Sequence, residues 1–348
     1  MEAQISEQKN WQAETIAMLS IASLPGVGFW TLNRLAALGH SFSKVIESSN
    51  IEEFLDFLKL GGASNVQIGS DDWETLRARL CREGAFQDRI LTERGIQVLH
   101  AAQNEFPDRL RAIKDPPYWL FAQGNLKLLN SKSIAVVGTR RPTQDGLWLA
   151  MFIVASLHSF GVCTVSGLAD GIDQQVHELS LRYDLPTIAV LGSGILLDYP
   201  KSSRNLRKEI IKKGGVILSE YLPKQKFSSE NFVRRNRLQS TISELVIPVE
   251  WAAKGGTAHT VRYAVEQKRH IMCLKMLDWD ILRRPELNEA ASMGASIFTA
   301  PSDNQAILNF IQSCLTDPLP KEEQLSISWD LSIKRQNGSK AQGADTKP

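Results

Sequence analysis

The sequence predicts an α/β protein, in which a Rossmann-like, mostly parallel sheet with helices on both faces is preceded by a small all-helical N-terminal domain. Two observations predict this fold. From about residue 96, short apolar runs rich in β-branched residues alternate with longer segments of helical pattern, as expected of strands joined by crossover helices. Earlier in the chain the apolar residues recur at helical spacing. We expect a helical domain at 1–90, an extended Rossmann-like domain at 91–318 and a disordered tail at 319–348.

The helical domain contains one distinctive turn. Residues 11–24, 51–60 and 71–95 carry helical apolar spacing, and a Pro-Gly-x-Gly turn at 25–28 opens a further amphipathic segment. This turn resembles a helix-hairpin-helix motif, in which glycines let backbone N–H groups approach a DNA phosphate. A tight turn between two packed helices produces the same pattern, so the sequence leaves both interpretations open.

The Rossmann-like domain contains nine candidate strands. Two short ones come first, and 15 to 25 residues of helical pattern separate most of the others. Continuous apolar strands with this spacing indicate a sheet that is buried on both faces. The candidates are residues 95–99, 116–124, 133–138, 162–167, 187–192, 214–220, 244–250, 270–275 and 295–300.

The composition excludes several classes of protein. Of the 348 residues, 43% are hydrophobic and 22% are charged, as in ordinary globular proteins. No apolar run approaches the roughly 20 residues of a membrane-spanning helix, and the polar start of the chain is unlike a signal peptide. The four cysteines form no CxxC pair, which argues against a zinc site or a disulfide framework. We therefore expect a cytoplasmic protein without a metal or cofactor.

Positive charge is concentrated in one segment. The net charge is only +2, but residues 201–237 contain 11 Lys and Arg against three Glu, an asymmetry typical of proteins that bind a polyanion. The basic residues at 204–213 fit a solvated helix face, whereas Phe232 stands beside arginines in the dense run 232–237. A ring for a base and cations for neighbouring phosphates suit single-stranded nucleic acid. Alternatively, Phe232 is a core anchor that holds an arginine loop.

Small and basic residues follow several predicted strands, at the edge where a parallel sheet binds its ligands. Backbone N–H groups of such turns bind anions. No GxxxxGK[ST] or GxGxxG pattern occurs, so neither a P-loop nor a dinucleotide site is predicted, and the arginines favour a ligand with several phosphates. The turns are Gly138-Thr139-Arg140, Ser166-Gly167, Gly192-Ser193-Gly194, Ser219-Glu220-Tyr221 and Lys254-Gly255-Gly256-Thr257.

Taken in order along the chain, these motifs resemble the DNA-processing protein A (DprA) family. The resemblance runs from about residue 11 to 312 and rests on SIAVVGTRRPTQDG, VSGLADGIDQQVH, TIAVLGSGILLDYP, GGVILSEYLP, FVRRNRL and GGTAHTVRYAVEQKR, with NEFPDRLRAIKDPPYWLFAQGNLKLL as a lead-in segment. It implies a non-catalytic protein that binds single-stranded DNA through a Rossmann-like domain and forms a homodimer. The family protects incoming strands during natural transformation and helps to load the RecA recombinase.

The family motifs and the strand-end turns together imply a DNA-binding site. Arginines would hold phosphates, the glycine turns would donate backbone N–H groups, and Phe232 would stack or support. The expected DNA-binding residues are Gly138, Thr139, Arg140, Ser166, Gly167, Phe232, Arg235, Asn236, Arg237, Lys254, Gly255, Gly256 and Thr257.

Three features depart from the family pattern. Asp170 stands where the family usually has Arg, which removes a phosphate partner and adds a repelling charge. Residues 239–241, Gln-Ser-Thr, replace a usual Ala-Gly stretch. We also expect no C-terminal winged-helix module of the kind that many members carry. These differences bear on affinity and on partner loading rather than on membership of the family.

A nucleotide-processing enzyme resembling the nucleoside-monophosphate phosphoribohydrolases is the alternative function. Their Pro-Gly-Gly-x-Gly-Thr-x-x-Glu signature is echoed by KGGTAHTVR, which places Arg262 on the Glu. Without that carboxylate, no residue is evident for the general acid–base role. His177 and Asp173, one helical turn apart, are expected to form a structural pair rather than a catalytic one.

Overall fold

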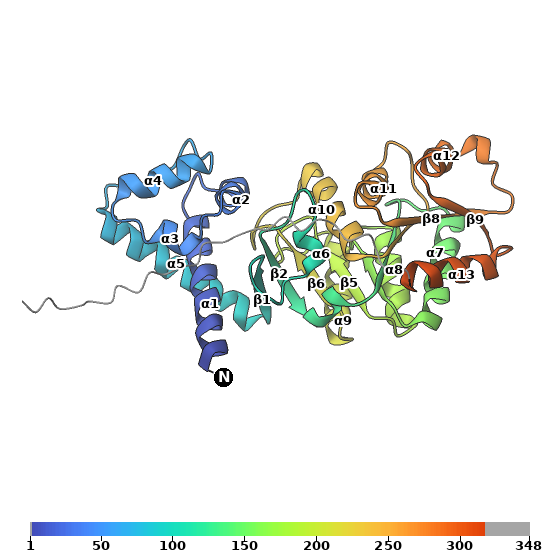
Figure 1. The fold of residues 1–348 in the computed structure, drawn as a ribbon, viewed down its shortest axis with the longest axis horizontal. Coiled ribbons are helices and arrows are strands. Elements are labelled where there is room, and N and C mark those ends of the chain that lie inside the picture. Colours follow the sequence, from blue (N-terminus) through green and yellow to red (C-terminus); the bar gives the residue numbers. More distant parts are fainter. Residues whose placement is uncertain (1, 317–348) are drawn as a thin grey trace, which may run out of the picture.

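One sheet forms the centre of the larger domain. The computed structural model describes residues 2–316, and the expected disordered tail at 319–348 lies outside them. Within these residues the strand order is β1-β2-β6-β5-β4-β3-β7-β8-β9 (Figure 1). β2 is antiparallel to both its neighbours, and the other pairs are parallel. The strands are β1 Ile96–His100, β2 Trp119–Gly124, β3 Ser133–Val137, β4 Cys163–Ser166, β5 Thr187–Val190, β6 Val216–Ser219, β7 Leu245–Pro248, β8 His270–Met276 and β9 Ser296–Ala300.

Helices cover both faces of this sheet, as predicted. One hydrophobic core lies between the sheet and α7, α8 and α13, and another between the sheet and α10, α11 and α12. Along the described part of the chain, no helix has the length and hydropathy needed to cross a membrane. The helices of this domain are α6 Asp108–Arg111, α7 Gln144–Leu157, α8 Ile172–Arg182, α9 Arg204–Lys212, α10 Ser229–Ile242, α11 Gly256–Glu266, α12 Pro285–Ser292 and α13 Asn304–Thr316.

The central strands show why their sequences are apolar without interruption. All five residues of β3 are buried. Ile134 and Val136 join the core beneath α7 and α8, whereas Ala135 and Val137 join the core beneath α10 and α11. Successive side chains of a strand point to opposite faces, so a strand covered on both sides needs apolar residues throughout. Each of the nine predicted strand segments overlaps an observed strand.

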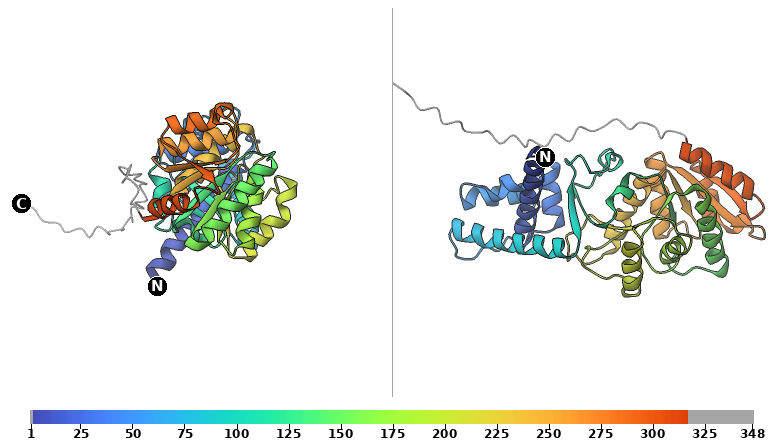
Figure 2. Two further views of the ribbon diagram at one scale, coloured as in Figure 1. Left: turned by 90° about the vertical axis from the view of Figure 1, so that its right-hand side faces the viewer. Right: turned by 90° about the horizontal axis from the view of Figure 1, so that it is seen from below.

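The helical domain packs against the sheet at one end of the elongated molecule (Figure 2). A continuous hydrophobic core runs from its helices to Trp119 and Phe121 of β2. The ring of Phe29 lies 5.5 Å from that of Trp119 and 5.2 Å from that of Tyr221. The predicted boundary at residue 90 falls within the last turn of α5. The helices are α1 Glu2–Ala22, α2 Phe29–Ala37, α3 Phe42–Ile46, α4 Ile51–Leu60 and α5 Trp73–Glu93.

The Pro-Gly-x-Gly turn joins α1 to α2. Gly26 adopts a φ of +94°, and a Cβ added there would lie 2.9 Å from the carbonyl carbon of Asn65. Both the left-handed backbone and the close approach require glycine. Gly28 is the exposed N-cap of α2, and a Cβ added there would meet nothing within 4 Å. Packing therefore explains Gly26, and a DNA contact at Gly28 stays a prediction.

Candidate nucleic-acid interface

A cavity of about 660 Å³ opens beyond the carboxyl ends of the parallel strands. Its walls come from the turn after β3, the first turns of α10, the start of α11 and two aromatic residues in the loops after β5 and β6. Open α/β sheets bind their ligands at this edge. The predicted site residues that line it are Gly138, Thr139, Arg140, Phe232, Arg235, Asn236, Gly255, Gly256 and Thr257.

Ser166 and Gly167 are buried and do not line the cavity, so the structure does not favour the DNA contacts expected of these two residues, which stay a prediction. Ser166 is fully buried, and its hydroxyl donates to the carbonyl oxygen of Val136 at 2.8 Å. A Cβ on Gly167 would lie 2.5 Å from Oδ2 of Asp173 and would also clash with the guanidinium of Arg235. The glycine is needed because two charged side chains pack against its backbone.

The turn after β3 uses its glycine and its backbone for packing. A Cβ on Gly138 would lie 2.7 Å from Cγ1 of Ile172, because α8 begins directly against the turn. The N–H of Thr139 donates to the carbonyl of Glu250 at 2.7 Å, and the N–H of Gly138 donates to the carboxylate of Asp173. Both backbone donors are therefore occupied, contrary to the expectation that this turn would offer them to a phosphate.

Asp173 and Arg235 form a buried charge pair under the cavity. Nη1 of Arg235 donates to the carbonyl of Gly167 at 2.9 Å and to the carbonyl of Val190. Burial raises the pKa of Asp173 and lowers the pKa of Arg235, and each of the two charges opposes the shift of the other. The hydrogen bonds of Arg235 hold α10 against the ends of β4 and β5. Because Arg235 is only 3% exposed, it adds positive potential to the cavity from a buried position.

The run from Phe232 to Arg237 is helical rather than a loop. It lies in α10, where the hydroxyl of the N-cap Ser228 accepts a hydrogen bond from the N–H of Asn231 at 3.0 Å. A helix rotates by about 100° per residue, so residues three and four apart share a face. Phe232, Arg235 and Asn236 consequently line the cavity, while Arg234 and Arg237 do not.

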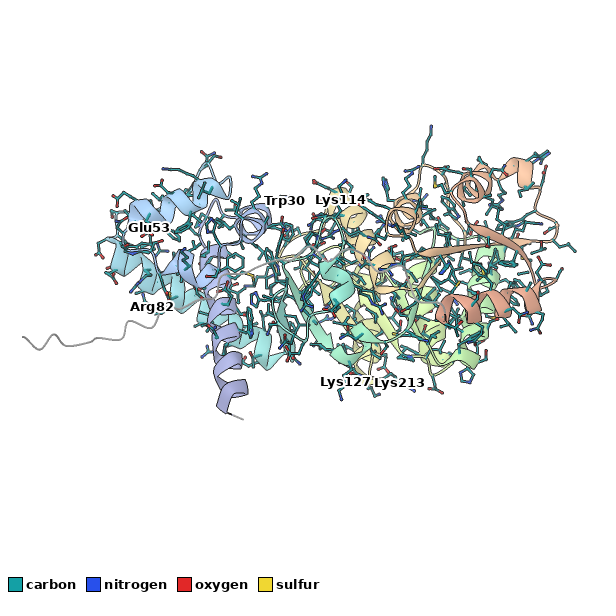
Figure 3. The ribbon with its side chains drawn as sticks, in the orientation of Figure 1. Trp30, Glu53, Arg82, Lys114, Lys127 and Lys213 are labelled. Atoms are coloured by element: carbon teal, nitrogen blue, oxygen red, sulfur yellow. The ribbon has the colours of Figure 1, made fainter. Side chains whose placement is uncertain are left out.

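Arg237 belongs to an internal ion-pair network, so the structure does not favour the phosphate contact expected of it, and that contact stays a prediction. It is 2% exposed, and its Nη1 and Nη2 donate to the two carboxylate oxygens of Glu220 at 2.6 and 2.7 Å. Arg234 donates to the same carboxylate at 2.6 Å and to Asp115 at 2.9 and 3.0 Å. The guanidinium of Arg234 also lies 4.9 Å from the ring of Trp30, at the junction of the two domains (Figure 3). The network thus joins α10 to the helical domain.

The start of α11 presents backbone donors to the cavity. The N-cap is Gly255, so no side chain caps the first turn. The N–H of Ala258 donates to the carbonyl of Gly255 at 3.2 Å, which leaves the N–H groups of Gly256 and Thr257 without intrahelical partners. Asn236 donates from Nδ2 to the carbonyl of Gly256 at 3.1 Å, which ties α10 to this helix. Lys254 is exposed beside the helix start but does not line the cavity. The positive end of α11 is therefore suited to a phosphate.

Arg140 is an exposed cation at the cavity. Its Cζ lies 4.9 Å from the centre of the Phe232 ring, and no carboxylate in the described part of the chain forms an ion pair with it. Arg141 also lines the cavity, and the acidic residue among the described lining residues is Asp173, which is buried against Arg235. The cavity consequently carries net positive charge, as a phosphate-binding surface requires.

Tyr199 and Phe227 are two of the cavity residues that the sequence reasoning missed. Their rings stack with centroids 3.6 Å apart. They come from the loops after β5 and β6, where no periodic pattern marks a site. The position of Phe227 directly after Lys224 and Lys226 in the basic segment is the signal that could have identified it.

The expected pair of His177 and Asp173 does not form. Nδ1 of His177 lies 2.8 Å from the hydroxyl of Thr187, and burial, aided by the charge of Arg235, lowers the pKa of His177 to about 3. A buried imidazole that stays neutral is a packing residue and does not line the cavity. Asp170 is exposed and accepts a hydrogen bond from the hydroxyl of Ser202 at 2.8 Å.

Comparison with known proteins establishes the family. The profile of the DNA recombination-mediator protein A family matches residues 97–308, more than half of the chain. The chain belongs to this family. The DNA processing protein DprA of Bacillus subtilis is 35% identical over 183 residues, which are 52% of this chain and 61% of that protein. The match therefore spans less than two thirds of this relative.

Two solved structures of the family share the fold. DNA processing protein A of Streptococcus pneumoniae superposes with a TM-score of 0.62 at 26% identity, over 84% of this chain and 97% of that chain. The protein from Helicobacter pylori, described for its single-stranded DNA binding mode, superposes with a TM-score of 0.52 at 27% identity, over 63% of this chain and 96% of that chain. The Rossmann-like fold predicted from the sequence is confirmed.

Proposed function

We propose that this chain binds single-stranded DNA in the cavity at the strand ends and acts, without catalysis, as a DNA-processing recombination mediator. Membership of the family and the single-stranded DNA binding of the Helicobacter pylori relative support the proposal. The observation that carries it is the arrangement of the cavity. Among the described residues, the guanidinium of Arg140, which forms no ion pair there, and the uncapped start of α11 line one positively charged cavity, whose acidic lining residue, Asp173, is buried against Arg235.

The same membership supports three finer proposals. The chain forms a homodimer, protects incoming single strands during natural transformation and helps to load RecA recombinase on them. Size-exclusion chromatography with light scattering tests the dimer. Nuclease digestion of a bound oligonucleotide tests protection, and RecA filament assembly with and without the chain tests loading.

Oligonucleotide binding at two salt concentrations tests the central proposal. Wild-type protein should prefer single strands to duplex. The logarithm of its binding constant should fall linearly with the logarithm of the salt concentration, with a slope of about −0.7 for each phosphate neutralised. Arg140→Ala should weaken binding about tenfold or more, as expected for a lost charge-assisted contact of about 1.5–3 kcal/mol, and should reduce the slope by about 0.7.

Arg182→Ala is the matched control, because it removes one exposed arginine at the opposite end of α8 from the cavity. It should leave affinity and salt slope unchanged. Equal losses in the two variants would show that only overall charge matters. Equal binding of duplex and single strands, or full affinity in Arg140→Ala, would count against the cavity as the binding site.

The phosphoribohydrolase alternative gains no support from the structure. Arg262, at the position of the signature Glu, donates to Glu289 at 2.9 Å and does not line the cavity. Asp173, the acidic residue that does line it, is engaged by Arg235. Release of ribose phosphate from a nucleoside monophosphate by the purified protein would nevertheless revive that function.

A further inference from the structure

Three aromatic rings cluster at one wall of the cavity. Tyr199 stacks on Phe227, with ring centroids 3.6 Å apart and an interplanar angle of 26°. Phe232 lies 5.6 Å from Tyr199 and 6.0 Å from Phe227, tilted against both. All three residues line the same cavity. A single-stranded nucleic acid site needs an aromatic face that a base can cover, so the question is which of these rings offers one.

Phe232 has little free surface. The guanidinium of Arg140 lies over its ring at 4.9 Å, and that of Arg235 lies 5.9 Å from the ring centre. The backbone of Gly192 packs against the ring edge, so closely that a Cβ there would come within 2.8 Å of Cε1. A base could cover Phe232 only by displacing Arg140, the residue proposed to bind the neighbouring phosphate of the DNA. The ring is better suited to fixing Arg140 in place.

Phe227 differs from Phe232 in its exposure. It is 47% exposed although one face of its ring is covered by Tyr199. Two exposed lysines, Lys224 and Lys226, precede it in the same loop. An aromatic ring that is rigidly backed on one side, open on the other and flanked by cations is the arrangement with which proteins hold unpaired bases.

We propose that Phe227, supported from behind by Tyr199, is the residue on which a DNA base stacks, and that Phe232 is a positioning residue for Arg140. The assignment rests on the proposed function and extends it, because it places a base as well as phosphates at the site. Since every base has a flat aromatic face, contact through Phe227 is tolerant of sequence. The phosphate next to that base then meets Arg140.

A comparison of normal and abasic oligonucleotides tests the assignment. Phe227→Leu should weaken binding of a normal single strand about tenfold, because the stacking contact with a base is lost. The salt slope should stay unchanged, because every phosphate contact is kept. The same variant should bind a strand of abasic residues as well as wild type does, since that strand has no base to stack. Phe227→Trp should restore or improve the affinity for the normal strand.

Phe232→Leu serves as the contrasting variant. Without the ring beneath it, Arg140 loses its fixed position, so affinity should fall for normal and abasic strands alike and the salt slope should drop by about 0.7. Circular dichroism would verify that both variants are folded. Full affinity of Phe227→Leu for the normal strand, or an equal loss on the abasic strand, would overturn the assignment. Failure of the wild type to bind any single strand would overturn the proposed function instead.

Discussion

The buried carboxylate of Glu220 should be one of the most sensitive positions for stability. It is 1% exposed and accepts three charge-assisted hydrogen bonds, at 2.6, 2.6 and 2.7 Å, from Arg234 and Arg237. Glu220→Gln would leave two buried guanidinium groups facing a neutral amide, with Asp115 as their remaining carboxylate. Breaking a buried ion pair in this way costs about 3–5 kcal/mol. We expect about 3 kcal/mol, because the half-exposed Asp115 continues to compensate in part.

Urea unfolding followed by circular dichroism measures this loss in the free energy of unfolding. The double variant Glu220→Leu with Arg237→Met should recover much of the stability, since it removes an unpaired charge and fills the space with apolar groups. A loss below about 1 kcal/mol in Glu220→Gln would refute the argument, because it would mean that the network is hydrated rather than buried.

The other predictions concern packing, pH and ligand binding. Gly167→Ala should destabilise by about 1–3 kcal/mol, because its Cβ would meet Asp173 and Arg235, whereas Gly28→Ala, with open space around it, should change stability by less than about 0.5 kcal/mol in thermal melts. Burial lowers the pKa of His177 to about 3. The free energy of unfolding should therefore decrease as the pH falls from about 6.5 toward 3, because His177 binds a proton in the unfolded chain but not in the native state. Unfolding curves that stayed unchanged between pH 7 and pH 4.5 would contradict this. Arg237→Met should retain the wild-type salt slope for single-stranded DNA, since its guanidinium faces Glu220 and not the cavity; a slope lower by about 0.7 would return it to the binding site.

Local pattern was enough to predict the strands and the helical domain. The runs at 133–138 and 187–192 are apolar because both faces of β3 and β5 are covered, and burial of this kind is legible in the sequence. Arg140 and the Gly255-Gly256 turn line the cavity, because a chain that ends a parallel strand emerges at the ligand edge of the sheet, and their contact with DNA stays a prediction. The helical state of residues 232–237 was missed because three arginines and an asparagine show no apolar period.

The sequence by itself determined where the nine strands fall along the chain, and it placed basic residues near the strand ends. Only the tertiary structure decided which of those residues are exposed at the cavity. Arg140, Arg235 and Arg237 are the same type of residue and all follow predicted strands. Arg140 is exposed, Arg235 donates to buried carbonyls, and Arg237 is paired with Glu220. A guanidinium is available to a phosphate only if it is not already hydrogen-bonded to an acceptor inside the protein. The acceptors of Arg235 and Arg237 come from segments that are distant in the sequence, so local sequence does not reveal them.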